Sequence, residues 1–231
     1  MNAKGINKSL PTEQFEILAN SLRIFPERIY QLDYYINEAQ DAEEGISNIE
    51  VAFRDVLNQI YGMMESLKRA GIITTLYEYP SITSVLCLRH SLQHNSGKVR
   101  NLFRDIILKH LAFVPAQIEY SASDGDRGRC PFPISITWYE TSVLNSNYSK
   151  KWNEITDYLN IETLKRQTTE DHLDWDHIYV DATTMITEAV SKLCKTFKGH
   201  FLPSGYDSEV YCDHFCKVDP LDMQDVKLKR V

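Results

Sequence analysis

The sequence predicts a mainly α protein: an up-and-down antiparallel helical bundle with a small β-hairpin and additional C-terminal helices. Three observations support this fold class. Apolar residues recur at helical spacing through about the first 111 residues, the connections between these segments are short enough to favour antiparallel neighbours, and the spacing changes to a strand-like pattern afterwards. We therefore divide the 231 residues into a helical bundle, 1–111, and an extension, 112–231, that packs on it.

The bundle is predicted to contain five helices. Pro11 opens the first pattern, and Pro26 is expected to end it and start a second helix, because proline cannot continue a helical hydrogen-bond ladder. The acidic stretch 41–45 is then expected to be a solvated break. The longest periodic segment follows over about 47–70, with Gly71 placed as its C-terminal stop. A fourth helix is predicted from about Ser81 to the end of the run 89–94, and a fifth over about 98–111.

The extension is predicted to begin with strands. Segments 114–120 and 134–139 show strand-like composition, and the turn-rich stretch 123–129 between them favours a hairpin. Two helices are predicted next, at 150–159 and 175–197. Periodicity is weak from Pro203 onward, so an irregular tail is expected there.

Composition limits the classes of function. Hydrophobic residues make up 43% of the chain, which is enough to fill a core. The net charge of -7 argues against binding nucleic acid through a broadly basic surface, so any RNA contact should be local or transient. Five cysteines are an odd number spread along a long chain, which favours reduced thiols. There is no long apolar run to indicate secretion or membrane spanning, and we expect a cytoplasmic protein with no membrane partner.

One run of residues points to chemistry: Arg89-His90-Ser91-Leu92-Gln93-His94. It lies near the end of a predicted helix and is followed by Asn95. Residues five apart on a helix differ by about 140° in direction, so Arg89 and His94 do not share a strict face. Arg89 must reach around the helix, or a second subunit must complete the site.

This run resembles the Arg-x4-6-His motif of HEPN-domain proteins, a helical family of ribonucleases and nucleotidyltransferase partners. The resemblance covers roughly residues 11–111, and His90 takes the place of the polar residue that follows the family's arginine. It implies a homodimer or heterodimer that brings two motifs together and cuts RNA without a metal or another cofactor. The implied protein is an endoribonuclease of a toxin or phage-defence system, with an antitoxin protein as an expected partner.

The resemblance assigns roles to five residues. His94 would take the proton from a ribose 2′-hydroxyl, and Arg89 would hold the phosphate that this hydroxyl attacks. His90 would orient the phosphate or donate a proton to the leaving oxygen. Asn95 and Gln93 would contact the substrate.

Other interpretations stay open. Arginine and histidine are common at helix ends, where they complement the dipole, so the run can be structural and the bundle a non-catalytic module that binds a partner protein or a nucleotide. His90 and His94 have the spacing of two zinc ligands, but Ser91 stands where a metalloprotease needs glutamate.

Three further clusters are interpreted structurally. The stretch 124–128 resembles a calcium loop only in part, the stretch 171–177 fits the capping of a following helix, and the stretch 212–216 has two cysteines without a second ligand pair. We expect a solvated loop, a helix start and ordinary thiols at these places.

Overall fold

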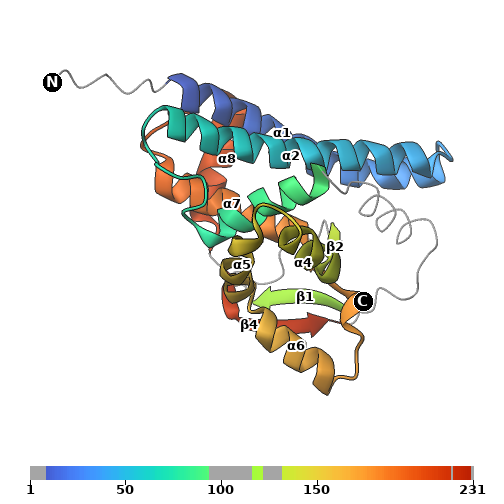
Figure 1. Ribbon diagram of the computed structural model, residues 1–231. Helices are drawn as coiled ribbons and strands as arrows, with labels where there is room; N and C mark the ends of the chain where they lie inside the picture. The colour runs from blue at the N-terminus through green and yellow to red at the C-terminus, as the bar shows by residue number, and fades with distance from the viewer. Residues whose placement is uncertain (1–8, 94–115, 122–131, 220, 230–231) are drawn as a thin grey trace.

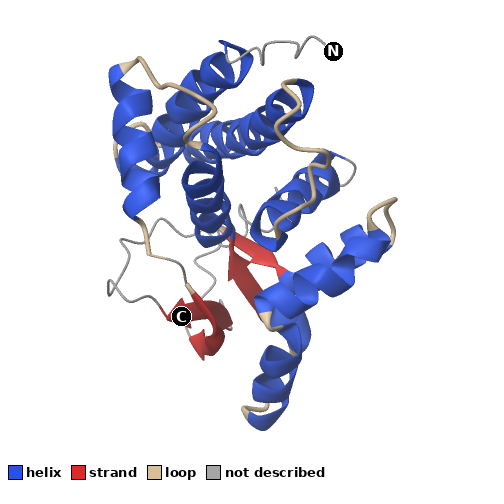
Figure 2. Ribbon diagram, turned by 90° about the vertical axis from the view of Figure 1, so that its left-hand side faces the viewer, coloured by secondary structure: helices blue, strands red, loops and turns tan. Residues whose placement is uncertain are grey.

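The structure is a computed structural model, and it describes residues 9–93, 116–121, 132–219 and 221–229. It confirms the mainly α fold class, with a small sheet beside the helices and further helices towards the C-terminus (Figure 1). The strands gather in the lower half of Figure 2, and helices make up most of the rest. The predicted fifth helix, 98–111, lies outside the described residues.

Two long antiparallel helices, α1 (Ser9–Asn37) and α2 (Ala42–Arg69), lie side by side along one edge of the molecule (Figure 1). Pro26 lies inside α1, so the predicted restart at this residue is wrong. Proline has no backbone N–H and so removes one hydrogen bond from the helix, but the apolar stripe of α1 continues on both sides of it. Phe25 is buried with its ring centroid 5.6 Å from that of Phe53 on α2. Packing against α2 therefore keeps one helix where the local pattern predicted two.

The start of α2 also differs from the prediction. The acidic stretch 41–45 is not a break, because Asp41 caps the helix by accepting a hydrogen bond from the Glu44 backbone N–H at 3.1 Å. Glu43 and Glu44 lie in the first turn, where negative charge favours the helix dipole. The predicted stop is confirmed at Gly71, whose φ of +73° is a left-handed conformation that suits glycine.

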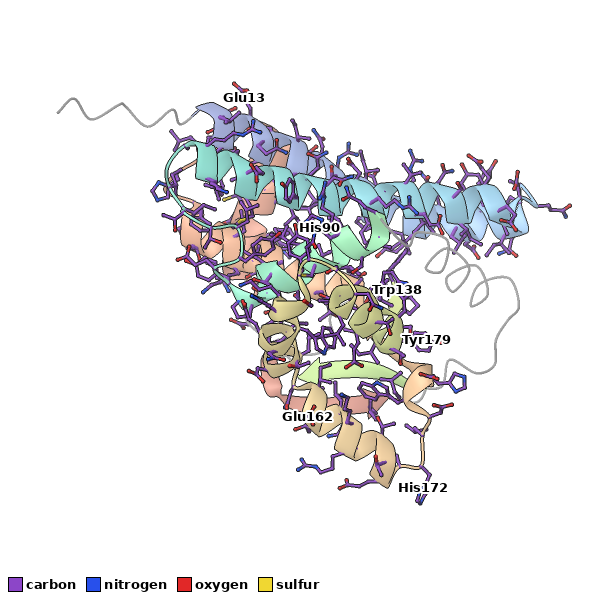
Figure 3. The ribbon with its side chains drawn as sticks, in the orientation of Figure 1. Glu13, His90, Trp138, Glu162, His172 and Tyr179 are labelled. Atoms are coloured by element: carbon purple, nitrogen blue, oxygen red, sulfur yellow. The ribbon has the colours of Figure 1, made fainter. Side chains whose placement is uncertain are left out.

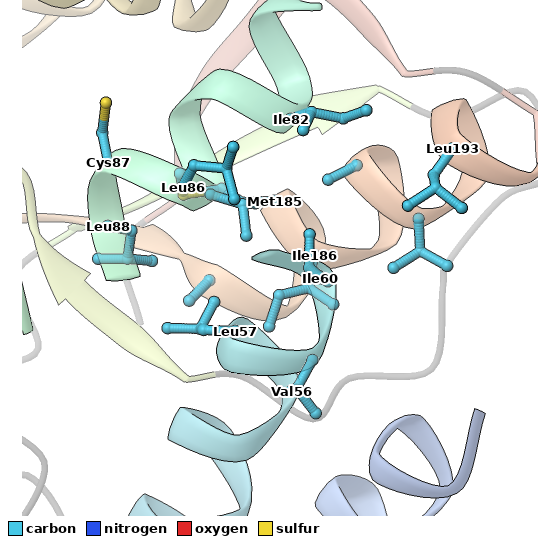
Figure 4. Close-up of a cluster of buried hydrophobic side chains, with 14 of the residues drawn as sticks. Val56, Leu57, Ile60, Ile82, Leu86, Cys87, Leu88, Met185, Ile186 and Leu193 are labelled. Carbon is cyan, nitrogen blue, oxygen red and sulfur yellow. The ribbon is translucent and has the colours of Figure 1, made fainter. Parts of the chain in front are cut away.

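Residues 80–93 form the next helix, which contains the first five residues of the run 89–94. Its apolar face packs between α2 and α7 (Ala182–Phe197), and Figure 4 shows the buried side chains from these three helices meeting. The hydroxyl of the fully buried Tyr139 donates to the Ser84 backbone oxygen at 2.6 Å, which ties this helix to α4 (Ile136–Leu144). The helix that carries Arg89 is thus held from several sides. The labelled side chains in this core are Val56, Leu57, Ile60, Ile82, Leu86, Cys87, Leu88, Met185, Ile186 and Leu193.

The small sheet has the strand order β2-β3-β1-β4. Its strands are β1 (Ala116–Ser121), β2 (Pro133–Ser135), β3 (Ile178–Asp181) and β4 (Asp222–Lys229). Both regions predicted as strands contribute to this sheet, but they do not pair with each other as a hairpin, because β3 lies between them. β3 runs parallel to β1 and antiparallel to β2, and β4 is antiparallel to β1.

Two caps explain why the predicted boundaries in the extension shift. Ser135 accepts a hydrogen bond from the Trp138 backbone N–H at 3.2 Å, so helix α4 begins inside the segment 134–139 that was predicted as a strand. Asp181 accepts from the Thr183 backbone N–H at 3.0 Å and caps α7. The predicted helix 175–197 is therefore a short 3-10 turn (Trp175–His177), strand β3 and then α7.

Three helices complete the extension. α5 (Trp152–Leu159) agrees with the predicted helix 150–159, whereas α6 (Ile161–Glu170) was not predicted. The stretch after Pro203 is not an irregular tail, because it forms α8 (Tyr206–Lys217) and β4. Hydrogen bonds to α1 hold the chain in place just before α8 begins. The Glu16 carboxylate on α1 accepts from the Ser204 and Gly205 backbone N–H groups, at 2.7 and 3.1 Å. No helix in the described ranges is both long and apolar enough to cross a membrane.

Candidate functional site

Arg89 lies between two helices, with its guanidinium held by side chains of α2. Its Nε donates to Asn58 Oδ1 at 2.8 Å, and its Cζ lies 4.2 Å from the centre of the Tyr61 ring. On its own helix, Nη1 lies 3.5 Å from Gln93 Oε1, at the outer limit of a hydrogen bond. The position of this cation is therefore defined by contacts, although Arg89 remains partly exposed to solvent.

A cavity of about 170 Å³ opens at this place. It is smaller than the ~300–1,000 Å³ typical of pockets that enclose a whole small molecule. It can therefore receive one group of a larger ligand. Two guanidinium groups border it, Arg54 from α2 and Arg89 from the neighbouring helix, and such groups bind phosphate oxygens through paired hydrogen bonds. Its lining residues are Arg54, Leu57, Asn58, Arg89, Leu92 and Gln93.

His90 has a different environment, although it follows Arg89 directly. Its ring stacks on Tyr148 with centroids 4.2 Å apart and an interplanar angle of 20°, and Tyr61 meets it edge-on at 6.1 Å. The Tyr77 hydroxyl oxygen lies 3.4 Å from His90 Nε2. In Figure 3 His90 lies near the centre of the view, among side chains from several parts of the chain. His90 is thus enclosed by aromatic rings from three separate segments.

Two of the tyrosines around His90, Tyr61 and Tyr77, stay protonated at neutral pH. Burial raises the pKa of Tyr77 well above its ordinary value, and its hydrogen bond with Tyr148 adds to this effect. Burial also raises the pKa of Tyr61, assisted by the nearby Glu65 carboxylate. The Tyr77 hydroxyl is within hydrogen-bonding distance of His90 Nε2, and the tautomer of the imidazole decides which of the two groups donates.

The structure locates three of the five predicted site residues, and the predicted roles of all five stay predictions. It brings Arg89 and Gln93 to the same cavity and turns His90 towards the aromatic cluster. His94 and Asn95 lie outside the described residues, so their predicted roles stay predictions. The same holds for the stretch 124–128, which lies outside the described residues as well.

Three residues of α2 were missed from the sequence: Arg54, Asn58 and Tyr61. They stand at positions i, i+4 and i+7, so they form one stripe on the helix surface next to the buried stripe. That spacing was visible in the sequence. What the sequence could not supply was the pairing of this stripe with Arg89, which comes from tertiary packing.

The other clusters behave largely as structural elements. Asp174 accepts from the Asp176 backbone N–H at 3.0 Å, so the stretch 171–177 does contain a cap. It caps a short 3-10 turn and not the predicted long helix, since α7 begins only at Ala182. In the ranges that the structure describes, no group of three or more His, Cys, Asp or Glu residues could hold a metal ion.

Comparisons with protein-family models, with curated proteins and with solved structures found no significant match to this chain. The resemblance to HEPN-domain proteins therefore depends on the run 89–94 and on the helical setting alone.

Proposed function

We propose that this protein is a metal-independent endoribonuclease of the HEPN type, acting in the cytoplasm as part of a toxin or defence system. The observation that supports this best is the position of Arg89, which together with Arg54 lines a cavity large enough for one group of a ligand. A phosphate of RNA carries the charge and the oxygen acceptors that two guanidinium groups bind. The local contact also agrees with the net charge of -7, which disfavours broad electrostatic binding.

In the proposed reaction, Arg89 holds the scissile phosphate and His94 takes the proton of the adjacent 2′-hydroxyl. The 2′-oxygen bonds to phosphorus, and the bond from phosphorus to the 5′-oxygen of the next nucleotide breaks. The departing oxygen takes a proton from solvent. The products are a 2′,3′-cyclic phosphate end and a 5′-hydroxyl end. Gln93 and Asn95 contact the substrate.

We assign His90 the role of a positioning residue. Its ring is stacked on Tyr148 and faces the Tyr77 hydroxyl, so it is held in one orientation. It can thereby fix the helix turn from which Arg89 projects. The proposal includes a homodimer that brings two runs together, because residues five apart on an ideal helix differ by about 140° in direction.

The test is RNA cleavage in the presence of a chelator. Wild-type protein is expected to cut single-stranded RNA with excess EDTA and to leave cyclic phosphate ends, which mass spectrometry of the fragments identifies. His94→Ala is expected to lower the rate at least about 100-fold, the usual size of a general-base contribution. His200→Ala, which changes a histidine away from the run, is the matched control. Intact RNA at every protein concentration, or equal cutting by His94→Ala, would contradict the proposal.

A second candidate function has its own supporting observation. The aromatic enclosure of His90 is also what a purely structural histidine would have. In that case the bundle is a non-catalytic interaction module that binds a partner protein or a nucleotide. His94→Ala would then change binding or stability while no cleavage activity exists to be lost.

A further inference from the structure

Three of the five cysteines come together where α7 packs against α8. Cys194 lies on α7 and is fully buried, while Cys212 and Cys216 lie one turn apart on α8 and are partly exposed. The Cys212 sulfur is hydrogen-bonded with both of the other thiols. The three cysteines are in the free thiol form.

The two helices are also fastened to each other at the end of α8. The Ser191 hydroxyl and the Lys195 ammonium group, both on α7, donate to the backbone oxygen of Val218, the residue that follows α8. These contacts fix the thiols of α8 against Cys194. The sulfur cluster is therefore a consequence of packing and not of a flexible chain end.

The environment distinguishes Cys212 from its neighbours. The hydrogen bond from Cys194 lowers the pKa of Cys212 to about 7, overcoming the opposite effect of burial, and Cys216 and Lys198 contribute to the lowering. The hydrogen bond to Cys212, and after it burial, raise the pKa of Cys194. Cys212 is thus the thiol that ionises first, with Cys194 as the proton donor beside it, and the thiolate is the reactive form of cysteine.

We propose that Cys212 is an oxidation site for hydroperoxides and that Cys194 is its disulfide partner. The Cys212 thiolate attacks one peroxide oxygen, the O–O bond breaks, and the leaving hydroxide takes a proton to become water. This gives a sulfenic acid on Cys212. The Cys194 sulfur then bonds to the Cys212 sulfur while the sulfenic oxygen leaves with the Cys194 proton, as a second water. Two thiols lose two electrons in total, and one hydrogen peroxide is reduced to two waters.

Cys194 is a better partner than Cys216 for geometric reasons. Side chains four residues apart on a helix have Cβ atoms about 5–6 Å apart, whereas a disulfide needs about 3.5–4.5 Å. A bond between Cys212 and Cys216 would therefore deform α8. A bond to Cys194 joins two helices whose packing can adjust, and it would lock α8 onto α7.

The experiment uses the full-length protein and hydrogen peroxide, followed by alkylation, digestion and peptide mapping by mass spectrometry. The expected product is a peptide pair linked through Cys194 and Cys212. Cys216→Ser is the matched control and should retain this link, while Cys212→Ser should lose it. In Cys194→Ser, Cys212 should accumulate as a sulfenic acid that dimedone traps.

A measurement on the wild-type protein covers the case in which Cys194→Ser does not fold. The rate of Cys212 alkylation by iodoacetamide should rise through a midpoint near pH 7, and at pH 7 it should exceed that of Cys216 about tenfold. Cys87, whose pKa is raised to about 12 by burial, should remain unmodified. Equal rates at Cys212 and Cys216, or a peroxide-induced link that joins Cys212 to any residue other than Cys194, would overturn the proposal.

Discussion

The two sides of the helix 80–93 differ sharply at neighbouring residues. On one side Arg89 borders a cavity that polar side chains and two leucines line, and on the other side His90 packs against Tyr77 and Tyr148. Tyr61 lies between the two sides and contacts both residues. In the sequence, Arg89 and His90 are neighbours in one motif, the run 89–94. Packing separates them into a group that can meet a ligand and a group that fixes the helix. The difference predicts that substitutions at the two positions affect different measurable properties.

The largest effect is expected from Arg89→Ala on RNA cleavage. In enzymes generally, removing a hydrogen-bond donor that stabilises negative charge in the transition state lowers kcat about 100- to 1,000-fold. Arg89→Lys should recover only part of this loss, because an ammonium group cannot form the paired hydrogen bonds of a guanidinium. Single-turnover cleavage assays measure the rate.

The free energy of unfolding of Arg89→Ala is the control that separates a loss of catalysis from a loss of folded protein. The free energy of unfolding of Arg89→Ala should change by about 1 kcal/mol or less, because the residue is partly exposed. A loss of stability much larger than this, with proportionate loss of activity, would mean that Arg89 is structural.

A smaller effect, on stability, is expected from His90→Ala. This change removes the stacking on Tyr148 and the contact with the Tyr77 hydroxyl. Together these should cost about 2 kcal/mol in the free energy of unfolding, measured by urea denaturation. His90→Phe retains a ring and should recover the stacking part.

The comparison of the two sides would fail if His90→Ala left stability unchanged. It would fail in a different way if His90→Phe folded as the wild type but abolished cleavage. In that second case the imidazole would take part in the chemistry directly.

The smallest effect is expected from Arg54→Ala on RNA affinity. One lost phosphate contact should weaken binding a few-fold and reduce the slope of log affinity against log salt by about 0.7, the value for one contact with a single strand. Fluorescence anisotropy at several salt concentrations gives this slope. Lys68→Ala, which removes a cation elsewhere on α2, is the control and should leave the slope unchanged. An unaltered slope for Arg54→Ala would remove Arg54 from the binding site.

Helices were predictable from the sequence where one apolar stripe continued for many turns. The segment 47–70 and the stop at Gly71 are examples, because helical spacing and a left-handed glycine are local signals. Pro26 misled the prediction, since tertiary packing of Phe25 against α2 outweighs the local preference of proline. The strands were harder, because β1 and β3 are parallel neighbours that lie far apart in the sequence.

The candidate site was predictable only in part for the same reason. Arg89, His90 and Gln93 could be singled out because they share one short run. Their separation into an open side and an enclosed side could not, because Asn58, Tyr77 and Tyr148 come from distant segments. Asp181, in contrast, was a local capping signal that could have been used to place the start of α7.

The most direct test of the central claim is where RNA contacts the protein. A single-stranded RNA with a 2′-O-methyl group at every position has no free 2′-hydroxyl to attack the phosphate. Photoactivated 2′-O-methyl-4-thiouridine in it can therefore be cross-linked to the intact complex. We expect the cross-linked peptides to cover residues 54–61 and 89–93. Cross-links confined to other segments, and unaffected by Arg89→Ala, would contradict the claim that the cavity beside Arg89 and Arg54 receives the phosphate.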